Sequence, residues 1–288
     1  MSVPIQRAGA PQTRWAIVAE EIRKLPAFVR RDFLVTWSYR LAFFTDWLNL
    51  LAQVVVFFFV SDLVDPSAVP SFGGERASYM QFVVVGITVT SFLQVSLARV
   101  TAAIRNEQVQ GTLEALLLTP TSHATLQLGS ALYELVYVPI RVVMFLALAA
   151  LLFDTSVVVA GVPQALVVLI AFVPFVWGLG VLSAAATITF RRGASIVGAA
   201  ASLLTITSGA YFPTDVFPSW LAWLAELNPM RVTLDAVRDA LLGGAGWSAM
   251  LPAIALLVPL SAVSLAVGIL AFRAALTREQ RKGTLGLY

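Results

Sequence analysis

The chain has 288 residues, of which 59% are hydrophobic and only 12% are charged, and its formal net charge is +3. With a mean hydropathy of +0.84, this composition lies outside the range of soluble domains and predicts an integral membrane protein. The chain has no cysteine and a single histidine, His123, so it offers neither disulfides nor thiolate or multi-histidine metal sites.

The region before the first apolar span has two parts. Residues 1–13 contain two prolines and one glycine and are expected to form a disordered tail. Residues 14–40 alternate apolar and basic side chains, and Pro26 is expected to kink them. A basic amphipathic helix of this kind is typical of the interface along the inner leaflet. We therefore interpret residues 1–40 as a cytoplasmic tail and an interface helix.

Apolar runs long enough to cross a hydrocarbon core of roughly 30 Å as helices follow this region. Alternating ten-residue strands are absent, so the expected fold is an all-α integral membrane fold. These runs form a predicted transmembrane domain, residues 41–272, followed by a cytoplasmic tail, residues 273–288. The six predicted spans are 41–61, 79–99, 125–152, 162–190, 195–212 and 249–272.

The basic residues indicate the orientation of these spans. Most Lys and Arg residues fall in the N-terminal region, in the loops after the second and fourth spans, and in the C-terminal tail. The opposite loops contain only Arg76, Arg231 and Arg238. Because cytoplasmic loops carry the excess of positive charge, both termini are predicted to be cytoplasmic. This distribution accounts for the net charge without a nucleic-acid partner.

Residues 213–247, before the last span, differ from the ordinary loop expected at residues 62–78. Two amphipathic stretches, Val216–Leu227 and Arg231–Leu242, are separated by an Asn228-Pro229 break. Each has about 12 residues, which is too few to span a bilayer. The segment is therefore predicted to form two short re-entrant helices on the outer side. Three tryptophans suit the membrane interface there: Trp220, Trp223 and Trp247.

Polar side chains within the spans are candidates for a translocation path, because ionisable groups are costly in hydrocarbon. In the structural alternative, Asp46 is hydrated near the cytoplasmic end or pairs with a basic residue, and Glu134 and Arg141 pair with each other or across helices. We favour the structural interpretation and retain the path-lining one. The candidates in the first span are Asp46, Asn49 and Gln53. Those in the third span are Tyr133, Glu134, Tyr137 and Arg141.

The fifth span carries a stripe of small residues, Ala194, Gly198 and Ser202, at intervals of four. Such a stripe permits close approach of another helix. Packing within the chain and a contact between subunits both remain open.

A polar, part-amphipathic break at residues 105–120 separates the second and third spans. Gly111 allows the chain to turn, and Pro120 biases the residue before it out of the helical region. Between them lies a small apolar face with a charged rim, which suits a groove on a soluble partner. The alternative is an interfacial helix that covers its leucines with lipid. The face comprises Leu113, Leu116 and Leu117, and the rim Glu107 and Glu114.

Two motifs of this chain resemble the ABC-2 family of ATP-binding-cassette transporter permeases. The first is Glu107-x-x-x-Gly111-Thr112-Leu113-Glu114-x-Leu116-Leu117-x-Thr119-Pro120. The second runs Gly209-x-x-Phe212-Pro213, Phe217-Pro218-x-Trp220-Leu221, Asn228-Pro229-Met230, then Arg238-x-x-Leu241-Leu242-x-Gly244. The resemblance covers nearly the whole chain and implies a six-helix fold of the type V exporter kind. It also implies a cytoplasmic coupling helix at about 100–120 and an extracellular gate at about 213–247.

The resemblance assigns expected roles to two sets of residues. The coupling helix would contact the ATPase through Glu107, Gly111, Thr112, Leu113, Glu114, Leu116, Leu117 and Pro120. The gate would comprise Phe212, Pro213, Phe217, Pro218, Trp220, Asn228, Pro229 and Arg238.

The sequence contains no Gly-x-x-x-x-Gly-Lys-Ser/Thr phosphate loop, so the chain itself is not expected to be an enzyme. The resemblance implies two ATPase subunits, which would bind ATP and Mg²⁺, and a second permease chain in a homodimer or a heterodimer. It places the multi-pass chain in the plasma (inner) membrane of a prokaryote, in contact with membrane lipids. The expected substrate of this efflux is an amphipathic drug-like molecule or a lipid.

Other interpretations lead to different functions. Export of a lipid-linked polysaccharide, of the O-antigen or teichoic acid type, is the nearest alternative within the family. An ion-coupled secondary transporter would use Asp46, Glu134 and Arg141 as a relay. A membrane-embedded enzyme would need convergent metal ligands or an activated nucleophile, for which the sequence offers little.

Overall fold

The computed structural model describes residues 40–65, 69–109, 142–153, 157–190 and 193–282, and the single residues Pro26, Arg30, Phe33, Leu34, Ser38 and Ile140. Most of the expected interface helix, the break from residue 110 onward, and the first part of the third span lie outside the described residues. The described chain is mostly helical, as expected for an α-helical membrane protein.

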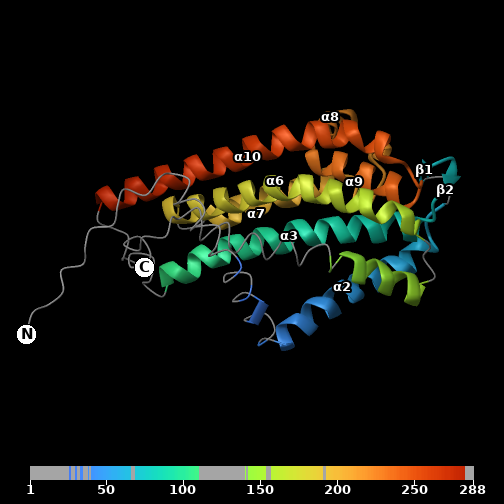
Figure 1. The fold of residues 1–288 in the computed structure, drawn as a ribbon, viewed down its shortest axis with the longest axis horizontal. Coiled ribbons are helices and arrows are strands. Elements are labelled where there is room, and N and C mark those ends of the chain that lie inside the picture. The colour runs from blue at the N-terminus through green and yellow to red at the C-terminus, as the bar shows by residue number, and fades with distance from the viewer. Residues whose placement is uncertain are drawn as a thin grey trace, which may run out of the picture.

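Four long helices, α3, α6, α7 and α10, run alongside one another, and α2 lies at an angle to them (Figure 1). Helix α6 packs against α3, α7, α9 and α10 and so occupies the centre of the bundle. The long helices are α2 (Arg40–Ser61), α3 (Tyr79–Val109), α6 (Val162–Thr189), α7 (Gly193–Thr207) and α10 (Trp247–Lys282). A further apolar helix spans Val142–Phe153. The short elements are η2 (Val159–Gly161), η3 (Thr214–Val216), α8 (Ser219–Glu226) and α9 (Pro229–Leu241).

The helices agree with the expected spans in position but not always in length. Helices α2 and α6 match the spans predicted at 41–61 and 162–190 to within one residue at each end. Helices α3 and α10 each continue ten residues beyond the predicted ends at 99 and 272. Helix α7 ends at Thr207 instead of 212, because the chain turns at Gly209, whose φ is +76°.

The surface of the bundle is rich in large apolar side chains, as a lipid-facing surface should be. Leu41 on α2 is 85% exposed, and Leu270 on α10 is 63% exposed. Among the described residues, two helices are long and apolar enough to cross a bilayer, Val159–Thr189 and Trp247–Arg278. The described residues also contain four shorter apolar helices: Trp47–Ser61, Tyr79–Gln94, Val142–Phe153 and Ser195–Thr207.

The segment expected to be an ordinary loop, residues 62–78, contains a small β-hairpin. Strands β1 (Ser71–Phe72) and β2 (Glu75–Arg76) pair antiparallel, with Ser71 opposite Arg76. Gly73 and Gly74 close the turn with φ values of 63° and 86°, a combination that two-residue hairpin turns require. The backbone of Gly73 packs directly on Gly243, just after α9.

Helices α6 and α10 are joined by hydrogen bonds as well as by apolar packing. The Ser261 hydroxyl donates to the Ala171 carbonyl oxygen at 2.8 Å, and the Ser264 hydroxyl donates to the Phe175 carbonyl oxygen at 3.0 Å. One turn further on, Gly268 packs against the backbone of α6. Small residues at such a contact let two helices approach closely in a membrane.

Candidate functional site at the two short helices

Helices α8 and α9 form a helical hairpin whose break is fixed by Asn228. The side-chain oxygen of Asn228 accepts from the Met230 backbone N–H at 2.9 Å and so caps α9. Its amide nitrogen donates to the Leu204 carbonyl oxygen at 2.7 Å and to Thr207 Oγ1 at 2.9 Å. Pro229 follows at the first helical position, which it suits because it has no N–H to satisfy. The start of α9 is therefore tied to the end of α7.

Tyr211, in the turn after α7, joins this turn to α2 and α3. The Tyr79 hydroxyl of α3 donates to the Tyr211 carbonyl oxygen at 3.0 Å. The Gln53 amide nitrogen of α2 donates to the Tyr211 hydroxyl at 3.3 Å. The Tyr211 ring also stacks on Phe57, with ring centroids 5.3 Å apart. One residue of the turn thus contacts two long helices.

Arg238, near the end of α9, is 1% exposed and reaches α3. Its Nη2 donates to the carbonyl oxygens of Phe82 and Ala210, at 3.1 Å in each case. The guanidinium carbon lies 3.4 Å from the centre of the Phe82 ring, within cation–π range. We call this set of interactions the Arg238 contact.

The Arg238 side chain keeps its charge despite its burial. Burial lowers the pKa of Arg238 to about 9, and the negative charge of Asp235 opposes this shift. The side chain therefore remains protonated at neutral pH. Its Nε has no hydrogen-bond partner among the described residues, so the charge is compensated chiefly by two carbonyl dipoles and an aromatic face.

A close approach of backbones brings the groups of the Arg238 contact together. Any Cβ at Gly86 of α3 would collide with the Ala210 carbonyl. Only glycine therefore lets the turn after α7 lie directly on α3. This approach sets the Ala210 carbonyl oxygen close to that of Phe82, so that one guanidinium nitrogen reaches both.

The structure divides the expected gate residues into three groups by burial. Asn228, Pro229 and Arg238 are buried and make the contacts described above or pack beside them. Pro213 and Phe217 are half-buried, whereas Phe212, Pro218 and Trp220 are exposed. The buried group anchors the hairpin, whereas Trp220 on α8 and Phe212 in the turn after α7 present exposed aromatic side chains.

The expected path-lining residues are only partly described. Asn49 is exposed on α2, and Gln53 is half-buried against Tyr211. Asp46 lies on α2, where its backbone alone is described. Tyr133, Glu134, Tyr137 and Arg141 lie outside the described residues.

The expected coupling residues lie at and beyond the end of α3. Glu107 falls in the last turn of α3, with only its backbone described. Gly111, Thr112, Leu113, Glu114, Leu116, Leu117 and Pro120 lie outside the described residues. Within the described part of the chain, no group of three or more His, Cys, Asp or Glu side chains could hold a metal ion.

Sequence reasoning missed several residues that hold the site together. Tyr211 lies inside the second motif, between Gly209 and Phe212, but no role was inferred for it. Phe82 gave no signal, because an apolar residue in a span is unremarkable. Gly86 is the one glycine of the second span, and an isolated glycine in an apolar run can mark a close backbone approach.

Comparison with known protein families places the chain in one of them. A family model described as ABC-2 type transporter matches residues 23–242, which include the polar break, the hairpin and the Arg238 contact. No curated protein matches the chain. The match spans most of the sequence and agrees with the apolar helical bundle. The chain is thus a membrane permease of the ABC-2 type transporter family.

Proposed function

We propose that the chain is the transmembrane subunit of an exporter that moves an amphipathic drug-like molecule or a lipid out of the cytoplasm or the inner leaflet. A separate nucleotide-binding subunit hydrolyses ATP and supplies the energy. The observation that carries this proposal is the continuity of α3. This helix runs from the Arg238 contact at Phe82 to Val109, directly before the segment expected to dock on the ATPase.

The length of α3 supports this role. At about 1.5 Å per residue, its 31 residues extend about 46 Å, which exceeds a hydrocarbon core of roughly 30 Å. Part of the helix therefore projects from the membrane, and its polar last turns suit the aqueous side. A continuous helix is stiff, so a push at one end is carried to the other.

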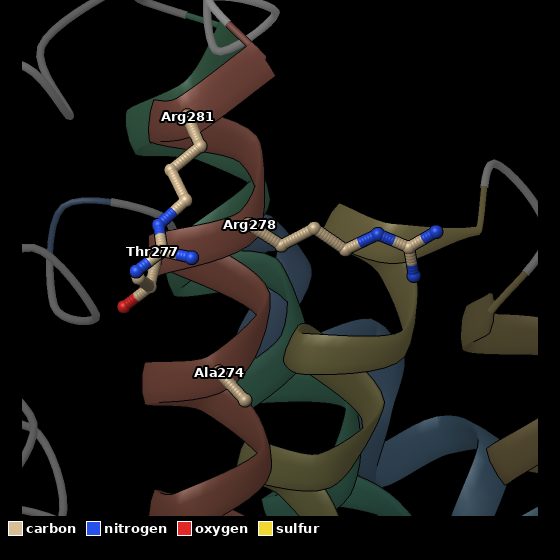
Figure 2. Close-up of a pocket in the computed structure, with 4 residues that line it drawn as sticks. All are labelled: Ala274, Thr277, Arg278 and Arg281. Carbon is tan, nitrogen blue, oxygen red and sulfur yellow. The ribbon is translucent and has the colours of Figure 1, made fainter.

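The basic end of α10 supports a cytoplasmic position for the Val109 end of α3. Figure 1 shows the C-terminal ends of α3 and α10 at the same end of the bundle, opposite β1 and β2. Arg278 and Arg281 extend in different directions from the end of α10, where they line an open pocket with Ala274 and Thr277 (Figure 2). Positive side chains at one membrane surface favour the cytoplasmic side. The short helices then lie on the outer side, and six spans leave both termini in the cytoplasm.

The proposed assembly contains two permease chains and two ATPase subunits. Part of the small-residue stripe on α7 is open to a neighbour: a Cβ at Gly198 would meet no atom within 4 Å, and Ser202 is exposed. These two positions therefore do not serve close packing within the described chain. The hairpin of α8 and α9, with Trp220 exposed on α8 and Phe212 exposed in the turn before it, would open or block the exit.

The test uses the chain purified with the ATPase that accompanies it and reconstituted into liposomes. ATP-dependent movement of a fluorescent phospholipid to the outer leaflet is the expected result. Glu114→Arg and Leu117→Asp should leave membrane insertion intact and abolish the stimulation of ATP hydrolysis by the lipid. Lipid movement by the permease chain without an ATPase, or full stimulation in both variants, would refute the proposal. Movement of a lipid-linked polysaccharide instead of the phospholipid would select that substrate class.

A further inference from the structure

We propose that Arg238 is a positioning residue that holds α9 and the first turns of α3 as one body, so that a displacement of α3 reaches the short helices. The inference rests on the proposed function where it assumes that the displacement begins at the ATPase. The contact itself is a property of this chain alone.

The Arg238 contact joins three segments that are distant in the sequence. Phe82 lies in the first turns of α3, Ala210 follows α7, and Arg238 itself belongs to α9. One nitrogen, Nη2, donates to carbonyl oxygens of the first two. Backbone carbonyls move with their helix or turn. The two hydrogen bonds therefore attach the Arg238 side chain to the main chain of α3 and of the turn after α7. An apolar side chain of the same size would fill the space without binding either carbonyl.

A buried charge makes this contact specific in its geometry. An isolated cation is costly away from water, so any separation of α9 from α3 would deprive Arg238 of the Phe82 carbonyl and the Phe82 ring that compensate its charge. Apolar surfaces can slide past each other at small cost, whereas a charged donor has few alternative acceptors nearby. The Phe82 ring, 3.4 Å from the guanidinium carbon, further restricts the side chain on the face that it covers.

The other end of α9 is held differently. Asn228 binds the start of α9 to Leu204 and Thr207 of α7. Helix α9 is thus attached to α7 at its start and to α3 near its end. Helix α9 also packs on α6 and α10, but Arg238 is its hydrogen-bonded attachment to α3, the helix that leads toward the expected coupling segment. A displacement of α3 would therefore pass to α9 through Arg238.

Because the sequence contains no cysteine, two introduced cysteines can be labelled selectively, and the distance between them tests the Arg238 contact. Gln94→Cys on α3 and Asp239→Cys near the end of α9 replace side chains outside the contact, the first exposed and the second half-buried. Spin labels at both positions report the distribution of distances between the two helices in lipid nanodiscs. Arg238→Met removes the donor and the charge. Arg231→Met is the matched control, because Arg231 lies on the same helix and pairs with Asp235 at 3.5 Å.

We expect one narrow distance distribution for the chain with Arg238 and for Arg231→Met, and a broader or shifted distribution for Arg238→Met. A distribution for Arg238→Met that matches the native one overturns the proposal. If Arg238→Met is not recovered as a folded protein, Arg238→Gln makes the same comparison, since it is uncharged and its side chain is too short to place its amide where the guanidinium nitrogen lies. An unchanged distribution in that variant likewise overturns the proposal.

A second measurement uses the complex with its ATPase and asks whether the contact transmits motion. In the native complex, the distance between α3 and α9 should be the same without nucleotide and after trapping with ATP and vanadate. Arg238→Met should still hydrolyse ATP but should move a fluorescent phospholipid at least about tenfold more slowly, as expected from the loss of two hydrogen bonds. A native distance that changes on trapping, or lipid movement at the native rate, overturns the proposal. If no ATPase accompanies the chain, the proposed function fails, and the nanodisc measurement still decides whether Arg238 holds the two helices together.

Discussion

Asn228→Ala is expected to lower the free energy of unfolding by about 3 kcal/mol. The substitution removes the cap of α9, a loss of about 1 kcal/mol in typical helices. It also removes two hydrogen bonds to α7, at 2.7 Å and 2.9 Å, and a neutral hydrogen bond contributes about 0.5–1.5 kcal/mol. Asn228 is 2% exposed, so water cannot readily replace these bonds.

The assay is reversible unfolding by dodecyl sulfate in mixed micelles, followed by tryptophan fluorescence. Thr207→Val removes one partner of Asn228 and nearly conserves volume. The double variant with Asn228→Ala should show a coupling energy of about 1 kcal/mol. Ser202→Ala serves as the control, because its exposed hydroxyl contacts only its own helix, at the Gly198 carbonyl oxygen. A loss of less than about 0.5 kcal/mol for Asn228→Ala would refute the view that this residue joins α9 to α7.

Two further substitutions test the junction around α3. Gly86→Val should destabilise the fold by about 2 kcal/mol or more in the same assay, since its Cβ would collide with the Ala210 carbonyl. Gly246→Ala, where a Cβ would meet nothing within 4 Å, should have almost no effect, and equal losses would contradict this reasoning. Tyr211→Phe should cost less than about 1 kcal/mol, because it loses only the bond from Gln53 at 3.3 Å and keeps its ring. Tyr211→Ala should cost several times more, and similar losses for both variants would argue against ring packing as the main contribution.

Features that depend on neighbouring residues could be predicted from the sequence. The apolar runs of α2 and α6 place those helices to within a residue or two. The Asn228-Pro229 break predicts the boundary between the short helices, because an asparagine cap and a proline at the first helical position are local signals. In each of these cases, the physical cause lies within one or two turns of the residue that shows it.

The ends of α3 and α10 could not be predicted from hydropathy. Apolar character fades near residues 99 and 272, but nine of the ten residues 273–282 and five of the ten residues 100–109 are Ala, Arg, Lys, Glu, Gln or Leu, which favour helices in water as well. The helices therefore continue to Val109 and Lys282. Hydropathy measures where a helix can meet lipid, and helix propensity measures where it can continue. The two criteria diverge at a membrane surface.

Long-range contacts could not be predicted from the sequence. One of them, between Arg238 and Phe82, changes how many basic residues should be counted on the outer side. Arg238 and Phe82 are 156 residues apart, and nothing local predicts that they meet. Counting basic residues treated Arg238 as a loop charge on the outer side, one of three exceptions to the asymmetry. The structure buries this charge against two carbonyl oxygens, and it pairs Arg231 with Asp235. Because the orientation rule concerns basic residues in solvated loops near the membrane, Arg238 should not weigh against it. Without Arg238 the asymmetry is stronger, so the structure adds to the case for cytoplasmic termini through a residue that seemed to oppose it.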